Sequence, residues 1–378
     1  MTSNGTNSGT PSAASAPAVA AATPSSSSSP SNSSTPPGSS TPSDSSTPSN
    51  SSQATMRAVT QPRYGTPDAL QVTSVSVPEP GPNDVRVRIR AAGVDAGTWH
   101  LVTGKPYLMR LLGFGLRGPR SGTLGLAFAG DVDAVGAGVT SFRPGDRVFG
   151  SHGGAFADFV CAPQSMLVRM PADLSFEAAA TLPVSGVTAL QAVRDAGEVS
   201  PGQKVLVLGA GGGVGSFAVQ LAVAAGATVT GVCSGSKASF VRELGAAEVV
   251  DYTQTDVTAL DRRWDVIIDI AGNRPLSRLR PILAPRGILV LVGGENGGPV
   301  LGGMERMLGA TVLNVFTGQR LRGLISRENA ADFEALAVAV TSGAIVPAID
   351  TVYPLAEVAA AVDHVAAGRA RGKVVLVP

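Results

Sequence analysis

The sequence predicts an α/β protein in which a doubly wound parallel sheet is inserted into a β-rich domain. Three observations support this prediction. A glycine-rich turn near residue 210 joins an apolar strand to an apolar helix. Near residue 186 a series of short strands gives way to alternating helices and strands. The chain ends in an apolar strand, residues 372–377, with no partner nearby in the sequence.

Residues 1–53 are rich in Ser, Thr, Pro, Asn, Ala and Gly, and Asp44 is their only charged side chain. Such a segment cannot bury enough apolar area to offset the entropy lost on ordering. We therefore expect a disordered tail. Its apolar run at residues 16–22 follows no Lys or Arg and is interrupted by Pro17, so we do not expect an export signal.

Residues 54–185 are expected to form the first part of the β-rich domain. Alternating or β-branched segments at 56–60, 70–77 and 85–89 are separated by Pro, Gly and Asp. Further short strands are expected at residues 130–135, 147–149 and 156–161. This spacing is typical of an antiparallel, barrel-like domain.

Residues 186–320 are expected to form the parallel sheet. Its predicted strands are residues 205–208, 228–233, 248–251, 265–270 and 288–292. Residues 321–378 then contain a helix at 330–340 and the terminal strand, which we expect to return to the first domain. The parallel sheet would therefore be an insertion within the β-rich domain.

The glycine-rich turn has the spacing Ala210-x-Gly212-x-x-Gly215. This is the dinucleotide fingerprint with alanine in the first place: Gly212 permits close approach of a pyrophosphate, and Gly215 permits helix-on-strand packing. The first helical N–H groups, at Gly213 and Val214, would face the phosphates. The alternative is a transmembrane helix, because no charge occurs between residues 204 and 237, but the glycines at 209, 211, 212, 213, 215, 226 and 231 interrupt that stretch.

Composition narrows the possible partners. The chain has 29 Lys and Arg against 28 Asp and Glu, so neither nucleic acid nor a membrane surface is expected. Two distant cysteines offer no disulfide framework and no CxxC pair, which favours a cytoplasmic location. His100, His152 and His364 are isolated, so we expect no metal site.

Five motifs together resemble the medium-chain dehydrogenase/reductase superfamily, and most closely its zinc-free quinone oxidoreductase branch, which includes bacterial NAD(P)-dependent alcohol dehydrogenases. The motifs are residues 81–87, 92–95, 135–148, 209–215 and 371–375. The resemblance covers residues 56–378. It implies a GroES-like catalytic domain, an inserted Rossmann domain that binds NAD(P), a small-molecule substrate and a homodimer.

Three departures separate the chain from the zinc alcohol dehydrogenases. Asp95 stands where those enzymes carry the first zinc cysteine, and Gly125-Leu126-Ala127 replaces their Gly-His-Glu. Their four-cysteine structural lobe is also missing. The zinc-free relatives instead reduce quinones or activated C=C bonds with hydride from NADPH and a proton from a side chain or water.

NADP(H) is expected in preference to NAD(H). About 20 residues beyond the fingerprint, NAD enzymes place an acid on the ribose. Here Ser234, Ser236 and Lys237 offer hydroxyls and a cation suited to a 2′-phosphate, although a solvated loop is the alternative. By resemblance, Tyr252 lies beside the adenosine phosphate, or merely packs. The other residues matched to cofactor-neighbouring positions are Thr188, Asn273, Gly293, Gly372 and Lys373.

Asp95, His100 and Tyr107 fall in the segment that borders the nicotinamide in the family. Either His100 or Tyr107 could donate a proton or hold a carbonyl; alternatively, each is a polar residue lining the cleft. Residues 107–120 are both apolar and basic, and we expect a substrate-cleft lid there rather than a membrane-surface helix.

The leading functional hypothesis is a zinc-independent NADPH-dependent oxidoreductase acting on quinones, enals or enones. One alternative is an enoyl-thioester reductase, in which Arg117 and Arg120 would meet a carrier phosphate. Another is a catalytically silent dinucleotide-binding protein.

Overall fold

A computed structural model describes residues 54–111, 115–116, 118, 122–293, 298 and 300–378. The predicted tail, most of the predicted lid, and the two arginines of the enoyl-thioester alternative, Arg117 and Arg120, lie outside the described residues. All elements named below belong to one compact unit, residues 52–378. None of the described helices is long and apolar enough to cross a membrane.

In the described part of the chain, a seven-stranded sheet is built around β3 (Asp84–Val94). Along β3, Val85, Val87 and Ile89 are buried, and the intervening arginines point the other way. Its strand order is β14-β15-β3-β4-β5-β7, with β6 also paired to β3, and β1 and β2 form a separate antiparallel pair. The bounds of these strands are β1 (Thr55–Thr60), β2 (Gln71–Ser76), β4 (Ala127–Val135), β5 (Arg147–Ser151), β6 (Phe159–Pro163), β7 (Leu167–Arg169), β14 (Ile349–Pro354) and β15 (Lys373–Val377).

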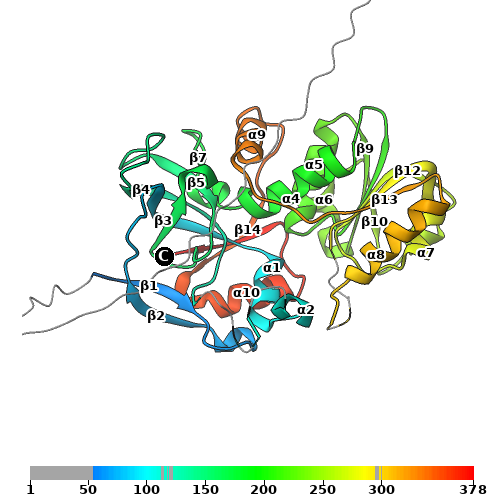
Figure 1. Ribbon diagram of the computed structural model, residues 1–378. Coiled ribbons are helices and arrows are strands. Elements are labelled where there is room, and N and C mark those ends of the chain that lie inside the picture. The colour runs from blue at the N-terminus through cyan, green and yellow to red at the C-terminus, as the bar shows by residue number, and fades with distance from the viewer. Residues whose placement is uncertain (1–53, 112–114, 117, 119–121, 294–297, 299) are drawn as a thin grey trace, which may run out of the picture. The chain divides into compact units, whose positions relative to one another are not determined.

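A second sheet has six described strands, all parallel, in the order β10-β9-β8-β11-β12-β13 (Figure 1). The strand order reverses between β8 and β11, and in such sheets ligands bind outside the carboxyl ends at that point. The bounds are β8 (Lys204–Leu208), β9 (Thr228–Cys233), β10 (Glu248–Asp251), β11 (Trp264–Asp269), β12 (Leu283–Leu291) and β13 (Arg320–Gly323).

Helices cover both faces of the parallel sheet, which is why its strands are apolar without alternation. Val205 and Val207 share a core with Phe217 of α5, whereas Leu206 and Leu208 share another with Leu279 of α7. The described helices are α1 (Ala96–Thr103), α2 (Tyr107–Met109), α3 (Phe176–Ala179), α4 (Val187–Leu190), α5 (Gly213–Ala224), α6 (Ala238–Glu243), α7 (Leu276–Leu279), α8 (Met304–Leu313), α9 (Ala330–Thr341) and α10 (Val358–Ala366).

The uncharged stretch between residues 204 and 237 is a strand, a turn, the helix α5 and a second strand. The fingerprint thus lies between a β-strand and a helix, and the transmembrane alternative does not hold for this stretch. Continuous burial from Val205 to Leu208 marks an interior strand.

The terminal strand β15 pairs antiparallel with β3, with Val374 opposite Val94. The chain therefore passes from the β-rich sheet into the parallel sheet and returns. This return brings Lys373 to the end of β3, beside Asp95.

Among the described residues, the parallel sheet has one strand more than the five predicted. Its sixth strand, β13, extends to Gly323, beyond the expected end at residue 320. The strand reads Arg-Leu-Arg-Gly, and only Leu321 is buried. A strand this short and polar carries neither an apolar run nor alternation, so the sequence does not reveal it.

Candidate active site

In the glycine turn between β8 and α5, the space beside Gly215 is filled by protein atoms, whereas the space beside Gly212 is open. A Cβ at Gly215 would lie 2.1 Å from the carbonyl oxygen of Gly209, so helix-on-strand packing excludes any side chain there. A Cβ at Gly212 would have Gly209 O, 3.6 Å away, as its one neighbour within 4 Å among the described atoms. The N–H groups of Gly213 and Val214 belong to the first turn of α5 and have no acceptor within the helix. This combination fits a pyrophosphate.

Ser234, Ser236 and Lys237 come together after β9. The two serine hydroxyls are 3.0 Å apart. Lys237 lies along the glycine turn, because its Cδ would be 2.8 Å from a Cβ at Gly211. Its Nζ donates to the carbonyl oxygens of Gly368 and Ala370, at 2.8 and 2.6 Å. The Lys237 side chain is therefore held beside the glycine turn, where a pyrophosphate could bind.

An acid that the sequence analysis did not single out lies beneath the same turn. A Cβ at Gly235 would be 2.5 Å from Oδ2 of Asp251, the last residue of β10. Hydrogen bonds from the Thr253 N–H and hydroxyl, at 2.9 and 2.8 Å, lower the pKa of Asp251 below its usual value. An ionised carboxylate thus lies near the predicted 2′-phosphate position, where its charge opposes a phosphate.

Three other predicted cofactor residues lie at the carboxyl ends of the parallel strands. Tyr252 is exposed and its N–H donates to Cys233 O at the end of β9. Asn273 is exposed in the loop after β11. Gly293 follows β12, where a Cβ would lie 1.9 Å from the carbonyl oxygen of Ile270. All three therefore border the edge of the sheet at which the glycine turn lies.

The C-terminal segment closes against the glycine turn. Gly372 has φ +86° and its N–H donates to Gly211 O at 3.2 Å. Lys373 follows, and its Cδ would be 3.1 Å from a Cβ at Gly213. The buried side chain of Lys373, which belongs to the β-rich domain, therefore lies beside the N-terminus of α5.

Lys373, Asp95 and Ser185 form a buried cluster. The Lys373 side chain is 1% exposed and that of Asp95 is 11% exposed. The ammonium donates to the Asp95 carboxylate, to Val94 O at 3.0 Å and to the Ser185 hydroxyl at 2.9 Å. The Ser185 hydroxyl donates to the same carboxylate oxygen. Asp95 is therefore held by a cation and a hydroxyl.

The contacts of Asp95 indicate whether a zinc ion could bind at this site. In the zinc enzymes the matching residue binds the metal, whereas here its carboxylate binds Lys373. The described residues contain no group of three or more His, Cys, Asp or Glu side chains able to hold a metal ion. The donor set described here does not fit a zinc site.

His100 is poorly suited to donate a proton. Its Nδ1 is 3.0 Å from the carbonyl oxygen of Lys105, so Nδ1 carries the hydrogen and Nε2 of the neutral ring is an acceptor. Burial lowers the pKa of His100 below its usual value, although the Lys105 carbonyl opposes that shift. The neutral form therefore dominates near pH 7.

Tyr107 lies in α2 and is 43% exposed. The Arg110 guanidinium is 4.9 Å from its ring centroid and donates to Gly104 O at 2.7 Å. The next residue, Leu108, donates its N–H to Val300 O at 3.1 Å, which joins α2 to the segment before α8. His100 and Tyr107 thus belong to the 100–110 segment and are not part of the Asp95 cluster.

Thr188 connects the cluster to a neighbouring loop. It lies one turn after Ser185 in a continuous helical stretch, residues 182–196. Its hydroxyl donates to Val184 O at 2.8 Å and accepts from the Ser326 hydroxyl at 3.0 Å. Thr188 therefore positions the loop after β13 through its side chain.

Sequence reasoning missed two residues of this site. Ser185 could have been found, because it precedes Thr188 by three residues and so shares its helix face. No sequence pattern pointed to Glu328. Burial is the main cause that raises the pKa of Glu328 above its usual value, and the charge of Asp95 adds to it.

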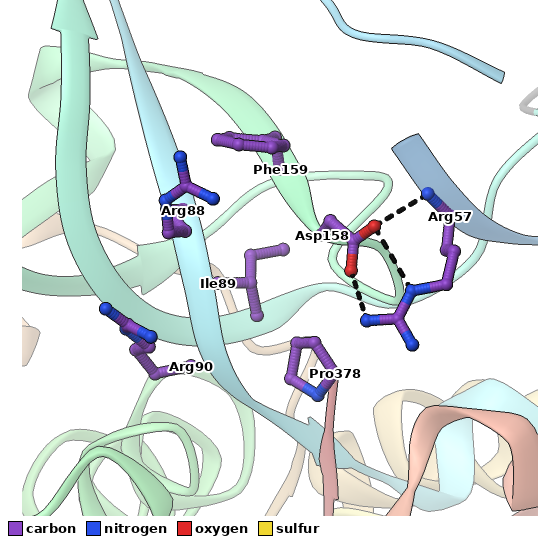
Figure 2. Close-up of a pocket in the computed structure, with 7 residues that line it drawn as sticks. All are labelled: Arg57, Arg88, Ile89, Arg90, Asp158, Phe159 and Pro378. Atoms are coloured by element: carbon purple, nitrogen blue, oxygen red, sulfur yellow. Dashed lines mark hydrogen bonds and ion pairs between the residues drawn. The ribbon is translucent and has the colours of Figure 1, made fainter. Parts of the chain in front are cut away.

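A hollow elsewhere on the β-rich domain is lined by residues outside this cluster (Figure 2). Its arginines already have partners: Arg57 pairs with Asp158 at 2.8 Å, as the dashed lines show. Arg88 and Arg90 pair with other aspartates on β4, at 3.2 and 2.7 Å. This hollow contains none of the predicted site residues.

Comparisons with known proteins agree with this geometry. The family model described as the alcohol dehydrogenase GroES-like domain matches residues 81–172, and that described as zinc-binding dehydrogenase matches residues 244–376. The chain is 33% identical to the quinone oxidoreductase of Pseudomonas aeruginosa over 327 residues, covering 83% of this chain and 97% of that protein. It is 31% identical to the chloroplast envelope quinone oxidoreductase homolog of Arabidopsis thaliana, covering 85% and 98%.

Solved structures give the same result. The Escherichia coli quinone oxidoreductase, determined in complex with NADPH, superposes with a TM-score of 0.73 at 26% identity. The alignment covers 85% of this chain and all of that one.

Proposed function

Because the chain belongs to the medium-chain dehydrogenase/reductase superfamily, in its quinone oxidoreductase-like branch, and is an NAD(P)-dependent oxidoreductase, we propose that it reduces quinones or conjugated enals and enones with NADPH, without zinc. One observation carries the proposal. The open position at Gly212 and the N-terminus of α5 lie beside Lys373, which the other domain holds through Asp95.

The residues fit a nicotinamide dinucleotide, which when bound would supply the hydride. The first turn of α5 would bind the pyrophosphate, and the Lys373 side chain would lie beside it. Hydride addition leaves an enolate or phenolate oxygen, which a nearby donor stabilises and protonates. Tyr107 can donate through its hydroxyl, whereas neutral His100 offers an acceptor nitrogen.

The direct test is oxidation of NADPH, followed by its absorbance, with a panel of quinones, enals and enones. We expect turnover with at least one of them, and we expect it to survive a chelator. Elemental analysis should find no stoichiometric zinc. A protein that turns over none of the panel, or that loses activity with its zinc, would contradict the proposal.

The NADPH preference depends on Lys237. Lys237→Ala is expected to weaken NADPH binding by roughly 10- to 100-fold, since one charge-assisted contact is worth about 1.5–3 kcal/mol. Fluorescence titration with NADPH and NADH measures the effect. Arg242→Ala, an exposed cation at the end of α6, is the matched control and should change neither affinity. An equal loss of NADH affinity would mean that Lys237 acts by packing on Gly211 and not through a 2′-phosphate.

We also propose a homodimer formed through α8 and the turn that follows it. Leu308, Val312, Val315 and Phe316 are 62–81% exposed, and α8 packs beside β13, the edge strand of the parallel sheet. An apolar surface beside a sheet edge is a typical subunit interface.

Phe316→Asp is expected to convert the dimer to a monomer, because it places a charge within this apolar surface. Sedimentation velocity measures the change. Val338→Asp, at a 68% exposed apolar position on α9, is the control and should remain dimeric. A Phe316→Asp protein that sediments as the parent does would rule out this surface.

We also propose a cytoplasmic location. Both cysteines, Cys161 and Cys233, are free thiols, which supports it.

A further inference from the structure

Three titratable side chains outside the candidate active site form a hydrogen-bonded chain. The Tyr353 hydroxyl lies 2.8 Å from Nδ1 of His364, and Nε2 of the same ring lies 3.0 Å from a carboxylate oxygen of Asp350. The rings of Tyr353 and His364 meet edge to face, with their centroids 6.0 Å apart. Asp350 and Tyr353 belong to β14 and His364 belongs to α10, so a strand and a helix of the C-terminal segment build this group.

A β-bulge in β14 brings Asp350 and Tyr353 to the same ring. Residues three apart on a regular strand point to opposite faces of the sheet. The register on β15 shifts here, because Ile349 lies opposite Lys373 while Thr351 lies opposite the very next residue of β15. Asp350 is therefore the extra residue of the bulge, which directs its side chain toward the imidazole that Tyr353 also contacts.

The chemistry of the three groups assigns their hydrogens. The Asp350 carboxylate can only accept, so Nε2 of the neutral His364 ring carries the hydrogen. Nδ1 is then an acceptor, and the Tyr353 hydroxyl donates to it. A base thus receives the hydrogen bond of a nucleophile, while a carboxylate orients the base and stabilises the imidazolium that would form. The members of a nucleophilic triad are related in the same way.

None of the three side chains is fully buried. The His364 and Asp350 side chains are each 18% exposed, Tyr353 is half-buried, and the adjacent Val352 is 45% exposed. Their strand, β14, is an edge strand of the described seven-stranded sheet. The hydrogen bonds are therefore partly shielded from water, which strengthens them, and a small electrophile in solution can approach the group.

We propose that Tyr353 is a nucleophile that accepts an acyl group from small activated esters such as aryl esters, with His364 as general base and Asp350 as its positioning residue. A tyrosine hydroxyl holds its proton at neutral pH and is a weak nucleophile. Transfer of that proton to His364 during the attack removes this limit. The proposal goes beyond the oxidoreductase function and does not depend on it, because the two sites share no residue.

The acyl transfer balances without a redox change. The Tyr353 oxygen forms a bond to the carbonyl carbon of the ester, its O–H bond breaks, and the proton goes to Nδ1 of His364. The tetrahedral intermediate then breaks its bond to the aryloxide, which leaves with the electron pair of that bond. His364 returns the proton to the aryloxide. The products are an acylated Tyr353 and a free phenol.

The test treats the full chain with p-nitrophenyl acetate and locates the acetyl groups by peptide mass spectrometry over time. Tyr252 and Tyr107 are 54% and 43% exposed, so they should be acetylated before half-buried Tyr353 if exposure alone decided reactivity. We expect Tyr353 to be acetylated roughly 10²-fold faster than either, the lower worth of general base catalysis. Acetylation of Tyr353 no faster than that of Tyr252 would overturn the inference.

His364→Gln removes the base and keeps a polar side chain. It should slow acetylation of Tyr353 by about 10²- to 10⁴-fold. A merely structural role of His364 predicts the opposite, because a hydroxyl released from its partner would be equally or more reactive. His152→Gln, at an exposed histidine, is the matched control and should leave the rate unchanged. A parental rate in His364→Gln would therefore overturn the inference.

Asp350→Asn provides a second measurement that keeps both the nucleophile and the base. It should slow acetylation of Tyr353 at least roughly tenfold, because the imidazolium formed during the attack loses its counter-charge. Thermal unfolding of each variant shows whether it is folded. If His364→Gln does not fold, a parental rate in Asp350→Asn would overturn the inference in its place.

Discussion

Asp95→Ala is expected to lower the free energy of unfolding by about 3–5 kcal/mol, because it leaves the Lys373 ammonium buried without its counter-charge. Lys373 is 1% exposed, and its remaining partners would be Val94 O and the Ser185 hydroxyl. Neither is charged, so most of the cost of removing the ammonium from water would be uncompensated. Urea denaturation of the parent and the variant measures the difference.

Two further variants make the test specific. Glu248→Ala removes a surface pair with Arg262, joined at 2.6 Å but 41% exposed on both sides, and should cost at most about 1 kcal/mol. Asp95→Ala combined with Lys373→Met leaves neither charge buried and should recover much of the lost stability. An Asp95→Ala effect no larger than that of Glu248→Ala would show that the buried pair is not strongly coupled.

The same cluster marks the limit of what the sequence could predict. Strands β9 and β10 lie at the predicted residues, because buried parallel strands are continuous apolar runs that can be recognised locally. The fold class and the superfamily were also predicted correctly, since their motifs are local. Asp95 and Lys373 are 278 positions apart, and only the antiparallel register of β15 on β3 brings them together.

Other parts of the site depend on contacts that no motif encodes. The hydrogen-bonding role of His100 depends on the carbonyl oxygen of Lys105, which accepts from Nδ1, and the residue type alone does not tell which ring nitrogen carries the hydrogen. Glu328 lies in the loop before α9, where the preceding residues Ser326 and Arg327 bind Thr188 and Gln191. Sequence patterns identify helices and strands by the periodic spacing of their apolar residues, and this loop is too short to show such a spacing.

Gly212→Ala is expected to weaken NADPH binding by roughly 100-fold or more while leaving the thermal midpoint unchanged. Gly212 has φ −97° and ψ −176°, which alanine adopts without strain, and its Cβ would meet protein atoms only at ordinary contact distance. The methyl group would instead occupy the space that a pyrophosphate needs, so one or two charge-assisted hydrogen bonds of about 1.5–3 kcal/mol each would be lost.

Gly215→Ala should behave in the opposite way. Its Cβ would lie 2.1 Å from Gly209 O, so the helix must move from the strand and stability should fall by about 1–3 kcal/mol or more. Gly153→Ala, with nothing within 4 Å, is the neutral control for both measurements. Fluorescence titration measures NADPH affinity and thermal unfolding measures stability. Together they distinguish a substitution that blocks the ligand from one that disrupts packing. A Gly212→Ala protein that binds NADPH as tightly as the parent would place the pyrophosphate away from this turn and remove the observation on which the proposed function depends.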